Sequence, residues 1–310
     1  MNGYEKGEHM LYLYSCPQMA ELSEKIARMN PDIICGNIDW ACFRDGFPNI
    51  RVRDVFSARN KDIAFLASFD RPGDIFRQLS VIYEIPRFAV RSFKVILPYY
   101  PTGTMERVEE EGEIATASTL ARMLSAIPHS ISGPTQIVIY DIHALQERFY
   151  FSDMVLPRLE TAIPLLKARI AEKENVTIAF PDEGAQKRFG RMFRDYPLII
   201  CHKIRSGDKR TVSVKEGEPE NRHVIIVDDL VMTGGTLLEC RKVIAARGAA
   251  SVSAYVTHGV FPQNSWQKFP DAGFSRFWMT DSCPATVQAV QGKKPFEILS
   301  LSKALSDILL

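Results

Sequence analysis

The sequence lacks the features that mark several large classes of protein. No apolar run in its 310 residues approaches the length of a membrane-spanning helix, and residues 1–10 carry two glutamates and no apolar signal core. Basic and acidic residues nearly balance, at 38 and 37, whereas nucleic-acid-binding proteins usually show a stronger basic excess. These absences predict a cytoplasmic protein that binds neither a membrane nor nucleic acid.

Two chemical signatures are also missing. The six cysteines are scattered without a Cys-x-x-Cys pair, which argues against a zinc site and favours reduced thiols used as small core residues. No Gly-x-x-x-x-Gly-Lys-Ser/Thr loop is present, so the chain is not a P-loop kinase.

Short β-branched runs alternate with amphipathic segments through most of the chain. In the first half we expect strands at residues 63–67, 93–97 and 136–140 and a helix at 116–127. In the second half we expect strands at residues 176–180, 198–201, 223–227 and 251–256 and helices at 184–193 and 235–247. Such alternation predicts two α/β domains with parallel sheets. Their expected bounds are residues 1–152 and 153–310, and the last helix can pack back on the first domain.

The most informative segment joins an apolar run, residues 224–227, to two carboxylates, Asp228 and Asp229. The run predicts a buried parallel strand, and α/β sheets bind ligands at the carboxyl ends of their strands. A turn into a helix follows, where glycines, backbone N–H groups and the helix dipole favour a phosphate. The carboxylates suit the vicinal hydroxyls of a ribose or a metal bound to them, and a plain acidic corner is the structural alternative. The candidate phosphate-binding residues are Met232, Thr233, Gly234, Gly235 and Thr236.

Three further strings carry charges suited to phosphoryl transfer, which depends on metals and fixed cations. Asp141 and His143 follow an expected strand and can project into a cleft, although a hydrogen-bonded surface histidine is the commoner fate. Asp182 precedes a glycine and a helix, so it can hold a metal, cap the helix, or do both. Residues 203–210 place four cations around one glycine, which predicts either a mobile loop that closes over a triphosphate or a solvated hairpin tip.

In their order and spacing, these strings resemble the ribose-phosphate pyrophosphokinase (phosphoribosyl pyrophosphate synthetase) family over roughly residues 40–282. The resemblance implies an α/β fold of two type I phosphoribosyltransferase-like domains, each with a mainly parallel sheet flanked by helices. It implies Mg²⁺-dependent transfer of pyrophosphate from ATP to ribose 5-phosphate, and by analogy a homo-oligomer. Asp228 and Asp229 match the family's ligands of the ribose hydroxyls, and residues 232–236 match its 5-phosphate loop.

The same resemblance implies metal and catalytic roles. His143 and Asp182 match residues that serve Mg²⁺, and Asp141 is a further candidate ligand beside His143. Lys203 and Arg205 match the catalytic pair of the family's flexible loop.

On the ATP side, Phe43 and Asp45 match residues that hold the adenine from a neighbouring subunit. The Arg-Gln-Asp run that grips ATP in the common branch is missing, and Glu106 and Arg107 are the expected substitutes. Phe47 stands where an acidic residue is usual.

The amino-acid sequence of residues 101–104 and 141–151 resembles the plant-type, phosphate-independent branch of this family more than the common branch. Two alternatives remain in other classes. A phosphoribosyltransferase accounts for residues 228–236 but not for the first domain or the basic loop. A non-catalytic regulatory subunit predicts loss of the loop cations or of His143, and both are present.

Overall fold

The computed structural model describes residues 10–206 and 209–309, and for residues 203–206 and 209–211 it describes the backbone alone. The chain divides into two compact units, which we call unit 1 and unit 2. Unit 1 comprises Met1–Glu160 with Leu301–Leu310, and unit 2 comprises Thr161–Ser300. Within the described ranges, no helix is long and apolar enough to cross a membrane.

Unit 1 is built on a six-stranded sheet in which every pair of neighbouring strands is parallel. The strand order is β2-β1-β5-β6-β7-β8. The strands are β1 (Leu11–Ser15), β2 (Ile33–Cys35), β5 (Asp62–Leu66), β6 (Ser92–Leu97), β7 (Thr135–Tyr140) and β8 (Val155–Glu160). The central strands β5, β6 and β7 are buried along most of their length, as expected for parallel strands covered on both faces.

The helices of unit 1 are α1 (Ala20–Met29), α2 (Val55–Ala58), α3 (Pro72–Glu84), α4 (Thr116–Ser125) and α9 (Ser302–Leu309). An antiparallel hairpin, β3 (Ile38–Cys42) with β4 (Pro48–Val52), stands apart from the main sheet. Helix α9 packs against α1, although nearly the whole chain separates them in sequence. Lys94 on β6 donates hydrogen bonds to the carbonyls of Ile308 (3.3 Å) and Leu309 (3.1 Å), which satisfies acceptors at the end of α9.

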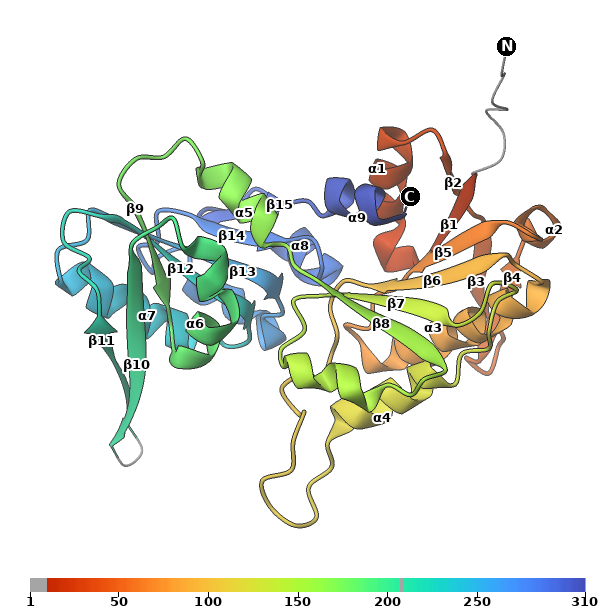
Figure 1. The fold of residues 1–310 in the computed structure, drawn as a ribbon, viewed down its shortest axis with the longest axis horizontal. Coiled ribbons are helices and arrows are strands. Elements are labelled where there is room, and N and C mark those ends of the chain that lie inside the picture. Colours follow the sequence, from red (N-terminus) through yellow and green to blue (C-terminus); the bar gives the residue numbers. More distant parts are fainter. Residues whose placement is uncertain (1–9, 207–208, 310) are drawn as a thin grey trace. The chain divides into compact units, whose positions relative to one another are not determined.

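Unit 2 has a seven-stranded sheet with the order β11-β10-β9-β12-β13-β14-β15 (Figure 1). All its pairings are parallel except that of β10 with β11. The strands are β9 (Val176–Phe180), β10 (Leu198–Ser206), β11 (Lys209–Glu216), β12 (His223–Val231), β13 (Ser251–Gly259), β14 (Phe277–Thr280) and β15 (Phe296–Leu299). Among the described residues, the α-helices of this unit are α5 (Ile163–Ile170), α6 (Glu183–Phe189), α7 (Gly235–Ala246) and α8 (Pro284–Val290).

Two apolar layers cover the two faces of this sheet. Leu237, Cys240 and Ile244 of α7 pack in one layer with Ile226 of β12. The other layer joins residues of α5 and α6 to Val227, the next residue of the same strand. Because neighbouring residues of a strand point to opposite faces, β12 is apolar at each position from Val224 to Val227. This explains why it is the strongest strand signal in the sequence.

The structure confirms the α/β class with parallel, helix-flanked sheets, and it moves the expected domain boundary. The sequence placed that boundary after residue 152, whereas unit 1 continues to Glu160. The reason is strand β8, which pairs along its length with β7 and so belongs to the first sheet. The final segment belongs to unit 1, where α9 packs against α1, so the last helix packs back on the first domain.

Candidate functional site

The candidate acceptor site lies in unit 2, at the carboxyl half of β12. This strand is central, with β9 on one side and β13 on the other. The sequence placed Asp228 and Asp229 after the strand, but the strand runs on to Val231. Asp228 lies opposite Val256 and Leu230 lies opposite His258 on β13, so ladder pairing holds Asp228 itself and the residue that follows Asp229. A rigid sheet therefore fixes the two carboxylates.

Backbone donors and one arginine surround these carboxylates. The N–H of Asp229 donates to Asp228 Oδ1 at 3.0 Å, and the N–H of Leu230 donates to Asp229 Oδ1 at 2.8 Å. Asp229 is only 4% exposed, and its Oδ2 lies 3.8 Å from the Arg188 guanidinium on α6. Arg188 itself lies over the ring of Phe189, 5.0 Å from the centroid. Sequence reasoning missed Arg188, because nothing in a helical Lys-Arg-Phe string indicates which carboxylate it meets.

Negative charge is in excess around Asp228. Burial raises the pKa of its carboxyl well above the ordinary range, and the charges of Asp229 and Asp182 raise it further. A hydroxyl donor or a cation placed here would favour the ionised form. The electrostatics thus suit a polyhydroxylated or metal-bound ligand, as the sequence predicts.

The loop after β12 forms a helix N-terminus able to receive an anion. Gly234 caps α7 with φ +80°, and a Cβ atom at this position would overlap the Phe269 ring, so only glycine fits. The N–H of Leu238 donates to the Gly234 carbonyl at 3.0 Å. The N–H groups of residues 235–237 therefore precede the first N–H that donates within the helix, and they have no intrahelical acceptor. Thr233 and Gly235 are exposed, Thr236 is half-buried, and the Met232 carbonyl accepts a hydrogen bond from Ser265 Oγ at 3.0 Å.

Asp182 serves as the N-cap of α6. Its Oδ1 accepts a hydrogen bond from the N–H of Ala185 at 3.0 Å, in the geometry that stabilises a helix start by about 1 kcal/mol. The charge of Asp182 also acts on Asp228. The structure therefore brings Asp182, Asp228 and Asp229 together at the carboxyl edge of the unit 2 sheet.

Lys203 and Arg205 lie on strand β10, not on a loop. The strand continues to Ser206 and pairs with β11, with Lys203 opposite Val212 and Arg205 opposite Arg210. The expected strand ended at residue 201, because the alternation of basic residues hides the β pattern. The side chains of Lys203 and Arg205 lie outside the part of the chain that the structure describes, so their catalytic role stays a prediction.

In unit 1, Asp141 and His143 follow strand β7 as the sequence predicts. Asp141 is 2% exposed and has φ +35°, an uncommon value for a residue with a side chain. Its N–H donates to the carbonyl of Glu160 on β8 at 2.9 Å, which helps to hold this conformation. The turn directs the chain away from the sheet, and His143 is exposed two residues later.

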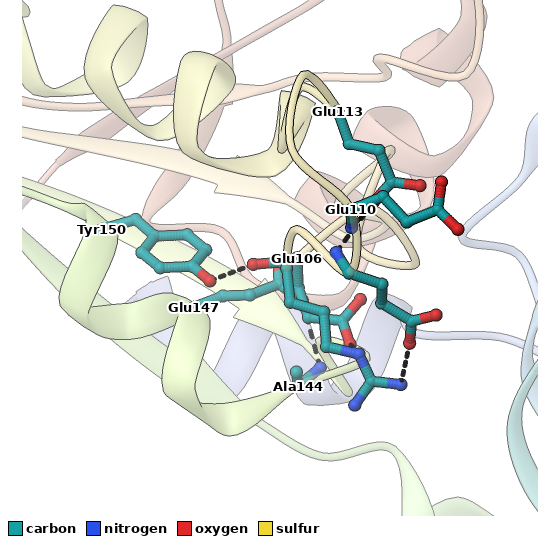
Figure 2. A network of polar contacts seen from close by, with 8 residues as sticks. Glu106, Glu110, Glu113, Ala144, Glu147 and Tyr150 are labelled. Carbon is teal, nitrogen blue, oxygen red and sulfur yellow. Dashed lines mark hydrogen bonds and ion pairs between the residues drawn. The ribbon is translucent and has the colours of Figure 1, made fainter.

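A long loop, residues 101–115, carries Glu106, Glu110 and Glu113 (Figure 2) and comes close to His143 at Gly103. The Tyr150 hydroxyl donates to the carbonyl of Glu106, and Oε1 of the buried Glu147 accepts from the N–H of Ala144 at 3.1 Å. A Cβ atom on Gly103 would lie 3.2 Å from His143 Cβ and 3.3 Å from Glu147 Oε1. Glu147 is a residue that sequence reasoning missed, although its place in the first turn of the short helix Leu145–Tyr150 is a usual one for an acid.

Glu106 and Arg107 therefore lie in the same part of unit 1 as His143. Arg107 is exposed and pairs within its own loop, 2.9 Å from Glu109 and 3.8 Å from Glu106. The N–H groups of Glu109 and Glu110 donate to Glu113, which lowers the pKa of that carboxyl. The loop is thus acidic overall, and its one arginine is engaged by acidic neighbours.

Phe43 and Asp45 lie in the tip of the β3–β4 hairpin. Asp45 Oδ1 accepts from the N–H of Phe47 at 3.1 Å, and the Phe43 ring is 56% exposed. In unit 1 the hairpin lies far from the loop that carries Glu106 and Arg107 (Figure 1). Within one chain the structure does not bring these two halves of the expected ATP site together.

Among the described residues, no group of three or more His, Cys, Asp or Glu side chains is arranged to hold a metal ion. The expected ligands Asp141 and His143 lie in unit 1, and Asp182 lies in unit 2. Mg²⁺ sites usually combine one or two carboxylates with water and substrate phosphates; Asp141 and Asp182 are donors of this kind, whereas His143 offers a nitrogen.

Comparison with known proteins decides the family. The model of the phosphoribosyl transferase domain matches residues 159–281, which covers most of unit 2. Over all of this chain and 78% of its own length, "Ribose-phosphate pyrophosphokinase 3, chloroplastic" of Oryza sativa subsp. japonica is 53% identical. The chain belongs to the ribose-phosphate pyrophosphokinase family. It is therefore an enzyme of the pyrophosphoryl-transferring class.

Other members support the same placement. "Ribose-phosphate pyrophosphokinase 4" of Oryza sativa subsp. japonica is 53% identical over 98% of this chain and 97% of its own length. "Ribose-phosphate pyrophosphokinase 3, mitochondrial" of Spinacia oleracea is 53% identical over 96% of this chain and 76% of its own length. These plant relatives confirm the predicted likeness to the plant-type ribose-phosphate pyrophosphokinases.

The fold agrees with this assignment. The crystal structure of phosphoribosylpyrophosphate synthetase from Mycobacterium smegmatis matches with a TM-score of 0.82 and 24% identity, covering 97% of each chain. At that identity the match concerns the fold alone. It shows that both units have the architecture of a ribose-phosphate pyrophosphokinase.

Proposed function

We propose that the chain transfers the pyrophosphoryl group of ATP to the anomeric hydroxyl of ribose 5-phosphate, giving phosphoribosyl pyrophosphate and AMP. The observation that carries the proposal is the acceptor corner of unit 2. There, a fixed and partly desolvated acidic pair on β12 is followed by the glycine-capped N-terminus of α7. The donor, ATP, is inferred from the resemblance to the family.

On the acceptor side, the carboxylates of Asp228 and Asp229 accept hydrogen bonds from the ribose hydroxyls. The N–H groups of residues 235–237 and the hydroxyls of Thr233 and Thr236 bind the 5-phosphate. These contacts hold the sugar at both ends and leave its anomeric oxygen to attack the β-phosphorus of ATP. The bond from that phosphorus to the oxygen it shares with the α-phosphate breaks, AMP leaves with that oxygen, and the proton of the anomeric hydroxyl passes to solvent.

On the donor side, the reaction concentrates negative charge on phosphate oxygens. Lys203 and Arg205 stabilise that charge, as fixed cations do in phosphoryl transfer. Asp141, His143 and Asp182 are the residues that would hold Mg²⁺. When bound, Mg²⁺ neutralises phosphate charge and orients the oxygens around the phosphorus.

One assay tests this function. Purified protein is mixed with ATP, Mg²⁺ and ribose 5-phosphate, and AMP and phosphoribosyl pyrophosphate are measured together. Equal amounts of both products are expected, with none after chelation of the metal. Consumption of phosphoribosyl pyrophosphate with a nucleobase would instead make the chain a phosphoribosyltransferase. Absence of both activities would make it a regulatory subunit.

The acidic loop of unit 1 leads to a second proposal, that the nucleotide donor is selected weakly and inorganic phosphate is not required. The Arg-Gln-Asp run is missing, Arg107 is engaged by acidic neighbours, and Phe47 replaces an acidic residue. Discrimination between bases depends on polar groups that the wrong ligand leaves unpaired, and few are supplied here. GTP or CTP should partly replace ATP in phosphate-free buffer. Strict ATP use would refute the first half, and activity only with added phosphate would refute the second.

Assembly and compartment are proposals as well. We propose a homo-oligomer, because exposed Phe43 and Asp45 match residues that serve a neighbouring subunit in the family, and light scattering of the purified chain measures its mass. The cytoplasmic location predicted from the sequence is tested by cell fractionation, which matters because two relatives are named chloroplastic and mitochondrial.

A further inference from the structure

Unit 2 contains a cavity at the edge of its sheet opposite to the acidic pair. His223 begins β12 and Ser251 begins β13, and both line the cavity. Asp228 lies five residues further along β12, which at about 3.3 Å per residue places it roughly 16 Å away. We call the cavity the amino-edge pocket. It has a volume of about 500 Å³, and its lining includes Lys173, Glu174, His223, Ser251, Arg276 and Trp278.

Hydrogen-bond donors dominate its polar lining. Lys173 and Arg276 carry positive charge, the His223 Nδ1 atom lies 2.8 Å from Ser251 Oγ, and three serines contribute hydroxyls. Glu174 is the only acidic residue of the lining. Arg276 is also held from outside by Glu297, at 2.9 Å. Such a lining complements a ligand that is rich in acceptor oxygens.

A buried donor in the wall supports this conclusion. The Trp278 side chain is 1% exposed, and within the described part of the chain its indole N–H has no hydrogen-bond partner. An indole N–H can only donate, and a buried donor without an acceptor destabilises the folded state. An acceptor oxygen brought into the pocket by a ligand, with a small shift of the ring, would satisfy it.

One effect opposes an anion at this edge. Parallel α/β units direct helix C-termini toward the amino ends of the strands, and α5 ends at Ile170 just before the pocket. Lys173 follows within the same turn, with its N–H donating to the Ile170 carbonyl at 3.0 Å. Its charge offsets the negative end of the helix. The loop from α5 to β9, seen at the upper left in Figure 1, thus supplies one of the two cations of the pocket.

We propose that the amino-edge pocket binds the phosphate group of a small metabolite, at a site separate from the acceptor site. A fork of donors from Lys173 and Arg276 suits phosphate oxygens. The volume exceeds what a phosphate ion needs, so the pocket also accommodates the sugar or nucleoside of a phosphate monoester. The ligand is either free inorganic phosphate or such a monoester, and both share the same contact chemistry.

The test uses Trp278 as its reporter. The full chain carries three tryptophans, so Trp40→Phe with Trp266→Phe leaves Trp278 as the only indole. Its fluorescence is titrated with inorganic phosphate, with AMP and with citrate. A saturable change is expected with phosphate or AMP, and a tighter response to AMP would identify a monoester as the ligand. A response to citrate equal to both would overturn the assignment to phosphate.

Two variants locate the binding. Lys173→Gln with Arg276→Gln should weaken the fluorescence response at least about tenfold, because it removes two charge-assisted contacts. Arg194→Gln, an exposed cation of the same unit outside the pocket, should leave it unchanged. A response that survives the double change, or none with any of the probes, would overturn the proposal. Circular dichroism and the thermal midpoint check that each variant is folded.

Discussion

The candidate sites of the two units differ in the kind of backbone structure that positions their side chains. In unit 2, the acidic pair belongs to a buried strand, and the phosphate loop contains Gly234, where any side chain would strain the backbone and meet the Phe269 ring. In unit 1, the corresponding residues stand on a turn and on a long exposed loop whose charged side chains pair mainly with one another. Substitutions of Asp228 and Gly234 in unit 2 should therefore change the stability as well as the binding of ribose 5-phosphate. Substitutions in the unit 1 loop should affect nucleotide binding alone.

The largest effect is expected at β10, the strand that carries the two proposed catalytic cations, Lys203 and Arg205. Lys203→Ala or Arg205→Ala should lower the turnover number about a hundredfold or more, because each removes a cation that stabilises transition-state charge. The Michaelis constants should change little. Steady-state kinetics for both substrates measure this. Lys215→Ala on β11, an exposed cation paired with Glu183 at 2.8 Å, is the control and should retain near-normal turnover.

The next largest effect is expected at the acidic pair, where we predict that a residue needed for activity lowers the stability of the fold. Asp228→Asn should lower kcat/KM for ribose 5-phosphate roughly tenfold to a hundredfold, since it weakens hydrogen bonds to a charged group. It should also raise the thermal midpoint at neutral pH, because the buried carboxylate is costly when ionised. Asp195→Asn, an exposed change in the same unit, should do neither.

The pH dependence has a definite sign. The folded-state pKa of Asp228 lies above its unfolded value, so its contribution to stability is complete below the unfolded pKa and is lost as pH rises through the folded pKa. The gain from Asp228→Asn should therefore grow as the pH rises above the unfolded-state pKa and level off above the folded-state pKa. Calorimetry across this range measures it, and a gain independent of pH would mean that Asp228 carries no electrostatic cost.

Alanine substitutions at two adjacent glycines, Gly234 and Gly235, distinguish the effect of backbone strain from the effect of contact with the ligand. Gly234→Ala should reduce the free energy of unfolding by about 1–3 kcal/mol, because it forces a left-handed residue against the Phe269 ring. Gly235→Ala has open space around its Cβ and should keep the stability. It should nevertheless raise the KM for ribose 5-phosphate if the phosphate approaches this backbone. Denaturant unfolding and kinetics of both variants distinguish the two effects, and equal loss of stability would contradict the structural difference.

The smallest effect is expected in the unit 1 loop. Arg107→Ala removes an exposed cation that is already paired with Glu109, and exposed pairs contribute little. We expect a rise of less than about fivefold in the KM for ATP, with unchanged stability. A loss of a hundredfold in turnover would instead place Arg107 among the catalytic cations, and the contrast between the units would fail.

The sequence predicted the elements whose residues carry a local pattern. The strand expected at residues 176–180 matches β9, and the helix expected at 235–247 ends one residue early in α7. The acidic pair and the phosphate loop were found because strand, turn and helix signals are contiguous there. Strand ends were missed where polar residues continue the ladder, as at β12. The sequence of one strand does not show how far a neighbouring strand pairs with it.

Features that depend on distant residues could not be predicted. The pairing of Arg188 with Asp229 and the buried position of Glu147 beside His143 arise only when separate elements meet. The sequence of β8 resembles that of a linker. It forms a strand because it pairs with β7 at the edge of the sheet. The unusual backbone of Asp141 likewise depends on its bond to Glu160 on that neighbouring strand.

The return of α9 to unit 1 bears on synthesis of the chain at the ribosome. Unit 2 is a continuous segment inserted between β8 and α9, so it can fold as soon as it has emerged. Unit 1 is translated first but lacks α9, and with it the carbonyl partners of Lys94, until residue 309 is made. The amino-terminal unit is therefore completed last, and during translation the face of α1 that will bind α9 stays exposed to chaperones.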